Sequence, residues 1–152
     1  MSTPLQVKMF KLAGAESVLQ GYLLGANNTL RWFPVQLPKG YIYQGACVVV
    51  RQISSIVDYV QNGPLCLEGV QMQVECRSLD SLQAQALARY LFLSFFPNSN
   101  FTVDNQFTSP PTSAPPAPNF RLSQRSMLDF EVQPQPAWVE ILTYRLWNSV
   151  NV

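Results

Sequence analysis

The residue types that most often carry out catalysis are sparse in this chain. It has no histidine, so the commonest general base and the commonest metal ligand are both missing. Its seven glycines form neither the GxGxxG nor the GxxxxGKS pattern of phosphate-binding loops. The sequence therefore predicts no catalytic residue, no metal site and no cofactor.

Two groups of residues could still do chemistry. Asp129 and Glu131 lie two apart on a predicted strand, so they would share a face, as cooperating carboxylates must. A solvated strand face explains this pair more simply, and we predict that the protein is not an enzyme. A cysteine nucleophile needs an electropositive, partly exposed setting. Cys47 and Cys76 fall in apolar strands instead, which indicates burial, whereas Cys66 has no clear place.

Three arginines are candidates for contacts with other molecules. Arg121 and Arg125 are the nearest approach to an anion site, because residues four apart on a strand lie on the same face. Such a pair is more often found at the rim of an interface or on the open surface. Arg89 lies on the surface of a predicted helix and is a further contact candidate.

Residues 108–118 hold five prolines and no charged residue. A segment this rich in proline cannot pack as helix or sheet. We therefore expect an extended arm or loop at 108–119 that reaches a partner. A ligand for an SH3-like groove is the weaker alternative, because no neat PxxP core with a basic anchor stands out. The predicted interface residues are Arg89, Pro110, Pro111, Pro115, Pro116, Arg121 and Arg125.

Only 12% of the 152 residues are charged, about half of the roughly 25% that is usual in soluble domains. Charge depletion with many aromatic residues is typical of interface cores, so we expect association with other subunits. A monomer covered by Gln, Asn, Ser and Thr is the alternative. The net charge of +1 comes without a basic stripe, which does not favour tight nucleic-acid binding. No signal peptide is expected, and the most apolar window, residues 84–96, is too short to span a membrane.

The periodicity of apolar residues predicts the elements that would hold these side chains. The clearest signal is at residues 65–77, where Val70, Met72, Val74 and Cys76 alternate with polar residues, as in a strand with one buried face. Helices are predicted at 4–24, with a break near Gly14, and at 78–96, and further strands at 29–35, 46–54, 120–132 and 138–147. The helix at 78–96 would be capped by Ser78 or Asp80, with the leucines, alanine and tyrosine at 79, 82, 86, 90 and 93 along one face. The strands at 46–54 and 65–77 would form a hairpin around the Asn-Gly-Pro at 62–64. We therefore expect one α+β domain over residues 1–152, with a mainly antiparallel sheet, two helices on one face and the proline-rich arm.

Four segments in this order resemble a known family. They are a Leu-Pro-Lys-Gly turn at 37–40, the strand ACVVVRQIS at 46–54, the strand LEGVQMQVECRS at 67–78 and an Ala- and Leu-rich helix at 79–93. The pattern resembles the tail terminator or tail completion proteins of long-tailed bacteriophages, which are head-tail joining proteins, over about half to two thirds of the chain.

This resemblance implies a structural virion protein of the phage neck. Subunits of that family form a ring, commonly a hexamer, that caps the head-proximal end of the tail tube and stops its polymerisation. The implied partners are other copies of the chain, the tail tube protein and a head-completion or connector protein. DNA would pass through the lumen without sequence-specific binding, and no membrane is involved. The protein would belong to the virion neck after assembly in the host cytoplasm. Another neck component, such as a head-completion or connector protein, and a non-catalytic soluble adaptor are the alternatives.

Overall fold

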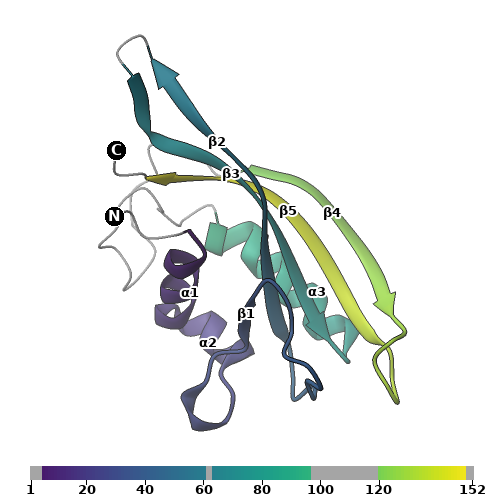
Figure 1. Cartoon of the computed structure of the whole chain (residues 1–152). Helices are drawn as coiled ribbons and strands as arrows, with labels where there is room; N and C mark the ends of the chain where they lie inside the picture. Colours follow the sequence, from purple (N-terminus) through teal and green to yellow (C-terminus); the bar gives the residue numbers. More distant parts are fainter. Residues whose placement is uncertain (1–4, 61–62, 97–119, 150–152) are drawn as a thin grey trace.

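The helices of the protein lie on one face of a five-stranded sheet (Figure 1). The computed structural model describes residues 5–60, 63–96 and 120–149. The strands are β1 (Trp32–Pro34), β2 (Cys47–Val60), β3 (Gly63–Ser78), β4 (Phe120–Asp129) and β5 (Ala137–Ser149). The helices are α1 (Leu5–Ala15), α2 (Ser17–Leu23) and α3 (Ser81–Tyr90), with a 3-10 turn, η1 (Ala26–Asn28), after α2 and a π-helical turn, η2 (Leu91–Phe95), after α3.

The strand order of the sheet is β1-β2-β3-β5-β4. β1 pairs with β2 in parallel, and the other three pairings are antiparallel. The predicted α+β class is thereby confirmed, and each predicted strand is found, although β2 and β3 are longer than expected and β4 ends earlier. The predicted arm at 108–119 lies outside the described residues.

The helix predicted at 4–24 is divided into α1 and α2. Leu5, Met9 and Leu12 recur every three or four residues and are buried, which places one stripe of α1 on the core. The Glu16 carboxylate accepts a hydrogen bond from the Leu19 N–H at 3.0 Å and so caps the start of α2. The predicted break near Gly14 is therefore confirmed, and it falls at the capping residue Glu16.

Asp80, one of the two predicted caps of α3, is the residue that caps the helix, which begins at Ser81 rather than at 78. The Asp80 carboxylate caps the helix by accepting a hydrogen bond from the Leu82 N–H at 3.0 Å. The predicted stripe through Leu82 is wrong, because Leu82 is 73% exposed. The buried side chains are Ala84, Leu87 and Ala88 instead. Both faces carry leucine, and the two alanines of the buried face let the helix approach the sheet closely.

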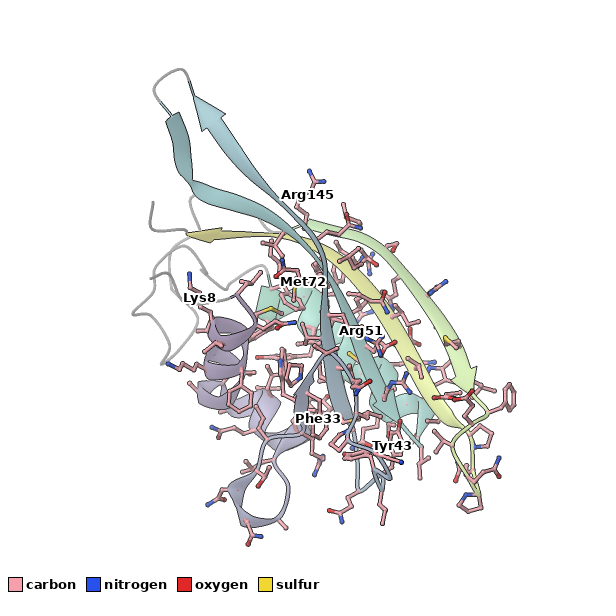
Figure 2. The ribbon with its side chains drawn as sticks, in the orientation of Figure 1. Lys8, Phe33, Tyr43, Arg51, Met72 and Arg145 are labelled. Atoms are coloured by element: carbon pink, nitrogen blue, oxygen red, sulfur yellow. The ribbon has the colours of Figure 1, made fainter. Side chains whose placement is uncertain are left out.

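The alternation predicted for β3 is confirmed and organises the core. Val70, Met72, Val74 and Cys76 are fully buried on the face that carries the helices, where Figure 2 shows Met72. The neighbouring strands add apolar side chains at matching positions of the register, which are Val48, Val50, Leu142, Tyr144 and Leu146. Aromatic side chains close this core, with the Phe96 and Tyr144 ring centroids 4.2 Å apart.

The β2–β3 hairpin continues beyond the rest of the sheet (Figure 1). Among the described residues, β1 flanks β2 at Trp32–Pro34, opposite Val48–Val50, and β5 accompanies β3 as far as Leu67. We call residues 58–60 and 63–66 the hairpin extension. A predicted hairpin is thus confirmed, and it is longer than the apolar pattern indicated.

Two leucines of α3 test this account of the core. Leu87→Ala should lower the free energy of unfolding by about 2–5 kcal/mol, because it opens a cavity in a fully buried site. Leu82→Ala is the matched control on the same helix and should change it by no more than about 0.5 kcal/mol. Urea unfolding measures both, and equal effects would contradict the assigned face.

Candidate interaction site

Two of the predicted interface arginines come together in the structure. Arg89 on α3 and Arg121 on β4 line the same hollow of about 680 Å³ between that helix and strands β4 and β5. We call it the arginine hollow, and its lining residues are Leu82, Gln85, Ala86, Arg89, Phe92, Arg121, Gln124, Ser126 and Glu140. The exposed face of α3 that was predicted to be buried therefore forms one wall of a site.

Arg125 is not part of the arginine hollow. The register between β4 and β5 shifts by one residue between Arg121 and Ser123. Arg121 therefore pairs with Tyr144 on the helix-covered face, whereas Arg125 pairs with Ile141 and lies on the other face. The prediction that Arg121 and Arg125 share a face is therefore wrong, because a bulge inserts one residue between them. Pro110, Pro111, Pro115 and Pro116 lie outside the described residues.

A buried carboxylate forms the floor of the arginine hollow. Glu140 is only 2% exposed and accepts hydrogen bonds from the Ser126 hydroxyl at 2.7 and 2.8 Å and from the Trp138 Nε1–H at 2.9 Å. The Gln124 amide donates a further hydrogen bond at 3.3 Å. These donors are neutral, so Glu140 is held by hydrogen bonds rather than by a described ion pair.

The same chain of hydrogen bonds fixes Arg121. The Gln124 side chain donates to Glu140 through its nitrogen and accepts from Arg121 Nη1 through its oxygen, at 2.6 Å. The Arg121 guanidinium also lies over the Phe92 ring, 3.7 Å from its centroid. A guanidinium has five N–H donors in a rigid fork, and within the described residues most of those of Arg121 make no hydrogen bond although the group is oriented. The hollow is therefore suited to bind a carboxylate.

Sequence reasoning missed Glu140, Gln124 and Phe92. A signal existed for Glu140, which is the one charged residue in the apolar run AWVEIL at 137–142, where an acid is rarely buried without a specific role. The contacts of Gln124 and Phe92 depend on the bulge in β4 and on the rotation of α3, neither of which has a local signal.

A network of ion pairs occupies the opposite face of the sheet. Glu75, 5% exposed, accepts from Arg51 Nη1 at 2.9 Å and from Arg77 Nε at 3.4 Å. Arg77 Nη1 also donates to Asp129 at 2.9 Å and to the Tyr43 hydroxyl at 3.5 Å. Burial alone would lower the pKa of Arg77, but its bonds to Tyr43 and Asp129 and the charge of Glu75 outweigh it and raise that pKa.

The predicted pair of carboxylates is separated by the end of a strand. β4 ends at Asp129, which is bonded to Arg77, and Glu131 lies in the following turn, where its backbone N–H donates to the Asp129 carboxylate at 3.1 Å. The prediction that the two share a strand face is therefore wrong.

Cys47 and Cys76 are buried as predicted. Burial raises the pKa of the Cys47 thiol to about 11 and that of Cys76 well above its ordinary value. Both thiols therefore stay protonated near neutral pH, which fits a structural role. The side chain of Cys66 lies outside the described part of the chain.

Residues 5–60, 63–96 and 120–149 contain neither a cluster of metal-ligating side chains nor a membrane-spanning helix. No group of three or more Cys, Asp and Glu side chains in these ranges could hold a metal ion. No helix in them is long and apolar enough to cross a membrane.

Comparison with known proteins gives no relative, since neither a protein-family model nor a curated protein matches the chain. The likeness to tail terminators therefore depends on the four segments at 37–40, 46–54, 67–78 and 79–93.

The role of Glu140 can be tested by truncation. Glu140→Ala should lower the free energy of unfolding by about 1–3 kcal/mol, because it leaves the buried donors of Trp138 and Ser126 without an acceptor. Glu131→Ala removes an exposed carboxylate in the turn between β4 and β5 and should cost less than about 0.5 kcal/mol. Urea unfolding gives both values. A Glu140→Ala protein as stable as the control would show that these hydrogen bonds do not hold the strands together.

A second prediction concerns the reactivity of the two buried thiols. It is best measured in a Cys66→Ser variant, which retains only Cys47 and Cys76. A pKa of about 11 leaves about one Cys47 thiol in a thousand ionised at pH 8. Alkylation at that pH should therefore be slow in the folded protein and should reach both thiols once denaturant is added. Rapid labelling of the folded variant would contradict the burial.

Proposed function

We propose that the protein is a structural subunit of the neck of a long-tailed bacteriophage. In this proposal its copies form a ring, commonly six-membered in the family it resembles, on the head-proximal end of the tail tube. The ring ends tube polymerisation, joins the tail to the head-completion or connector protein and leaves a channel for DNA. The protein would act in the virion and assemble in the host cytoplasm, without a catalytic step.

The hairpin extension is the observation that carries the proposal. A two-stranded hairpin is marginally stable in water unless a third strand or a packing layer supports it. Among the described residues, β2 has no neighbour on its outer side beyond Val50, and β5 pairs with β3 as far as Leu67, opposite Ser149. Contact with a second molecule would supply the missing support, as expected of a subunit built for an assembly.

A second surface suited to association lies at the far edge of the sheet. β4 is ten residues long and pairs only with β5 among the described strands. Leu122 and Met127 are exposed along it, and Phe130 just beyond it is 67% exposed. A long edge strand with apolar side chains is a template for pairing with another chain.

These two surfaces differ, and that difference favours a ring over a symmetric dimer. A contact between unlike patches joins subunits head to tail, and such a series closes into a ring when the rotation per subunit allows it. The charge content of 12% supports obligate contacts of this kind, since interface cores are depleted of charged residues.

The proposal predicts a discrete assembly larger than the 17.1 kDa monomer. The absolute mass in solution is measured by light scattering over a tenfold range of concentration, with and without polymerising tail tube protein. We expect either a ring-sized species or a monomer that assembles on tubes, and tubes that stop growing, with the protein at one end in electron micrographs.

A shortened hairpin provides the matched control. Replacing residues 58–67 by Asn-Gly joins the paired residues Val57 and Glu68 through a two-residue turn and should preserve the circular dichroism spectrum but abolish assembly. A wild-type protein that remains monomeric at every concentration and leaves tube growth unchanged would contradict the proposal and favour the adaptor. A ring that ignores tubes but binds a head connector would favour another neck component.

A further inference from the structure

We propose that the arginine hollow of one copy receives the turn between β4 and β5 of a neighbouring copy, so that Glu131 of that turn pairs with Arg89 and Arg121. We call residues 130–136, all of which the structure describes, the β4–β5 turn. This inference rests on the proposed assembly, and it names side chains that meet at one contact between its subunits.

Glu131 carries a carboxylate that is available to a partner. The residue is exposed, and its backbone N–H, rather than its side chain, is hydrogen-bonded to Asp129. The other carboxylates whose side chains the structure describes cap helices or accept hydrogen bonds from other side chains, and they are those of Glu16, Glu75, Asp80, Asp129 and Glu140. Among the described side chains, Glu131 is therefore the one acidic group left to bind a cation of another molecule.

Hydrogen bonds hold the β4–β5 turn in shape. The Asp129 carboxylate accepts from the Glu131 N–H at 3.1 Å, and the Gln133 side-chain amide donates to the Phe130 carbonyl oxygen at 3.2 Å. The Gln135 side-chain amide donates to the first backbone carbonyl oxygen after β3, at 3.1 Å, and so ties the end of the turn to the start of the α3 segment. A turn that is already ordered loses little conformational freedom when it binds.

The β4–β5 turn also carries an apolar side chain that the hollow can cover. Phe130, next to Glu131, is 67% exposed. In the arginine hollow, Leu82 is 73% exposed and lines the same space as Phe92 and the two arginines. The contact would therefore bury apolar surface beside an ion pair, and aromatic residues with arginine are enriched in interfaces.

The arginine hollow is complementary to this turn in charge and geometry. Its two guanidiniums outweigh the one carboxylate of Glu140, which already accepts hydrogen bonds from neutral donors. Arg121 is held over the Phe92 ring and by Gln124, so its N–H groups are positioned to bind a carboxylate through two parallel hydrogen bonds. The volume of about 680 Å³ is within the range of about 300–1,000 Å³ of clefts that enclose a ligand, so the tip of a turn can enter.

The β4–β5 turn faces away from the arginine hollow of its own copy. Glu131 borders a separate hollow beside Arg77, whose ion pairs lie on the opposite face of the sheet from Arg89 and Arg121. Figure 1 shows the turn projecting beyond the ends of β4 and β5, where a second molecule can reach it. The contact therefore joins two unlike surfaces of different copies, as a head-to-tail ring requires.

Charge reversal on either side tests the contact. Arg121→Glu and Glu131→Arg should each raise the protein concentration needed for half-assembly by about tenfold or more, because like charges would face each other. An equimolar mixture of the two variants should regain assembly, since each reversed side chain then meets an opposite charge on the other protein. Native mass spectrometry measures the assembled fraction, and co-sedimentation with tail tubes replaces it if the wild type assembles only on tubes.

Two further variants separate the contact from general effects of charge and folding. Arg89→Glu changes an exposed residue of the hollow that makes no hydrogen bond with the described residues, so it should weaken assembly even if Arg121→Glu disturbs the fold. Arg145→Glu makes the same change of charge on the opposite face of the sheet, where Figure 2 shows Arg145 pointing away from the helices, and should assemble like the wild type. Circular dichroism checks that each variant folds.

The outcomes distinguish this inference from the proposed function. If the wild type assembles and the reversals at Arg89, Arg121 and Glu131 assemble equally well, the contact is wrong and the ring stands. If the single reversals abolish assembly but the mixture does not recover, Glu131 and Arg121 do not face each other and the pairing is overturned. If the wild type assembles neither alone nor on tail tubes, the proposed function fails and this contact fails with it.

Discussion

The alternation of side chains along β3 is the constraint on which the rest of the structure depends. This middle strand is hydrogen-bonded to β2 and β5 along most of its length. Val70, Met72 and Val74 face the helices, whereas Glu75 and Arg77 join the ion pairs of the opposite face. A slip of one residue would carry the charged pair under the helices, so burial on one face and ion pairs on the other together fix the register.

Within the described residues, two parts of this sheet have no neighbouring strand. β2 and β3 continue past β1 and β5, and β4 forms a long edge. The Glu140 hydrogen bonds hold that edge against β5 and orient Arg121 beside it. The same interactions that stabilise the monomer thus prepare the surfaces that we assign to assembly.

The sequence predicts the features that depend on local periodicity and not those that depend on packing choices. The alternation at Val70–Cys76 and the cap at Asp80 are local, and both were predicted. The buried face of α3 was not, because Leu82 and Leu87 are equally apolar and only the sheet decides between them. The bulge after Arg121 was also missed, since it has no glycine or proline to mark it, and it moves Arg125 away from the arginine hollow.

Hydrogen exchange of backbone amides tests the central claim, that the hairpin extension is completed by a second molecule. Peptides that contain residues 58–60 are compared with peptides from residues 70–77 in dilute and in assembled protein. We predict that amides at 70–77 are protected in both states and that those at 58–60 gain protection only on assembly. Equal and strong protection of residues 58–60 in the dilute monomer would contradict the account.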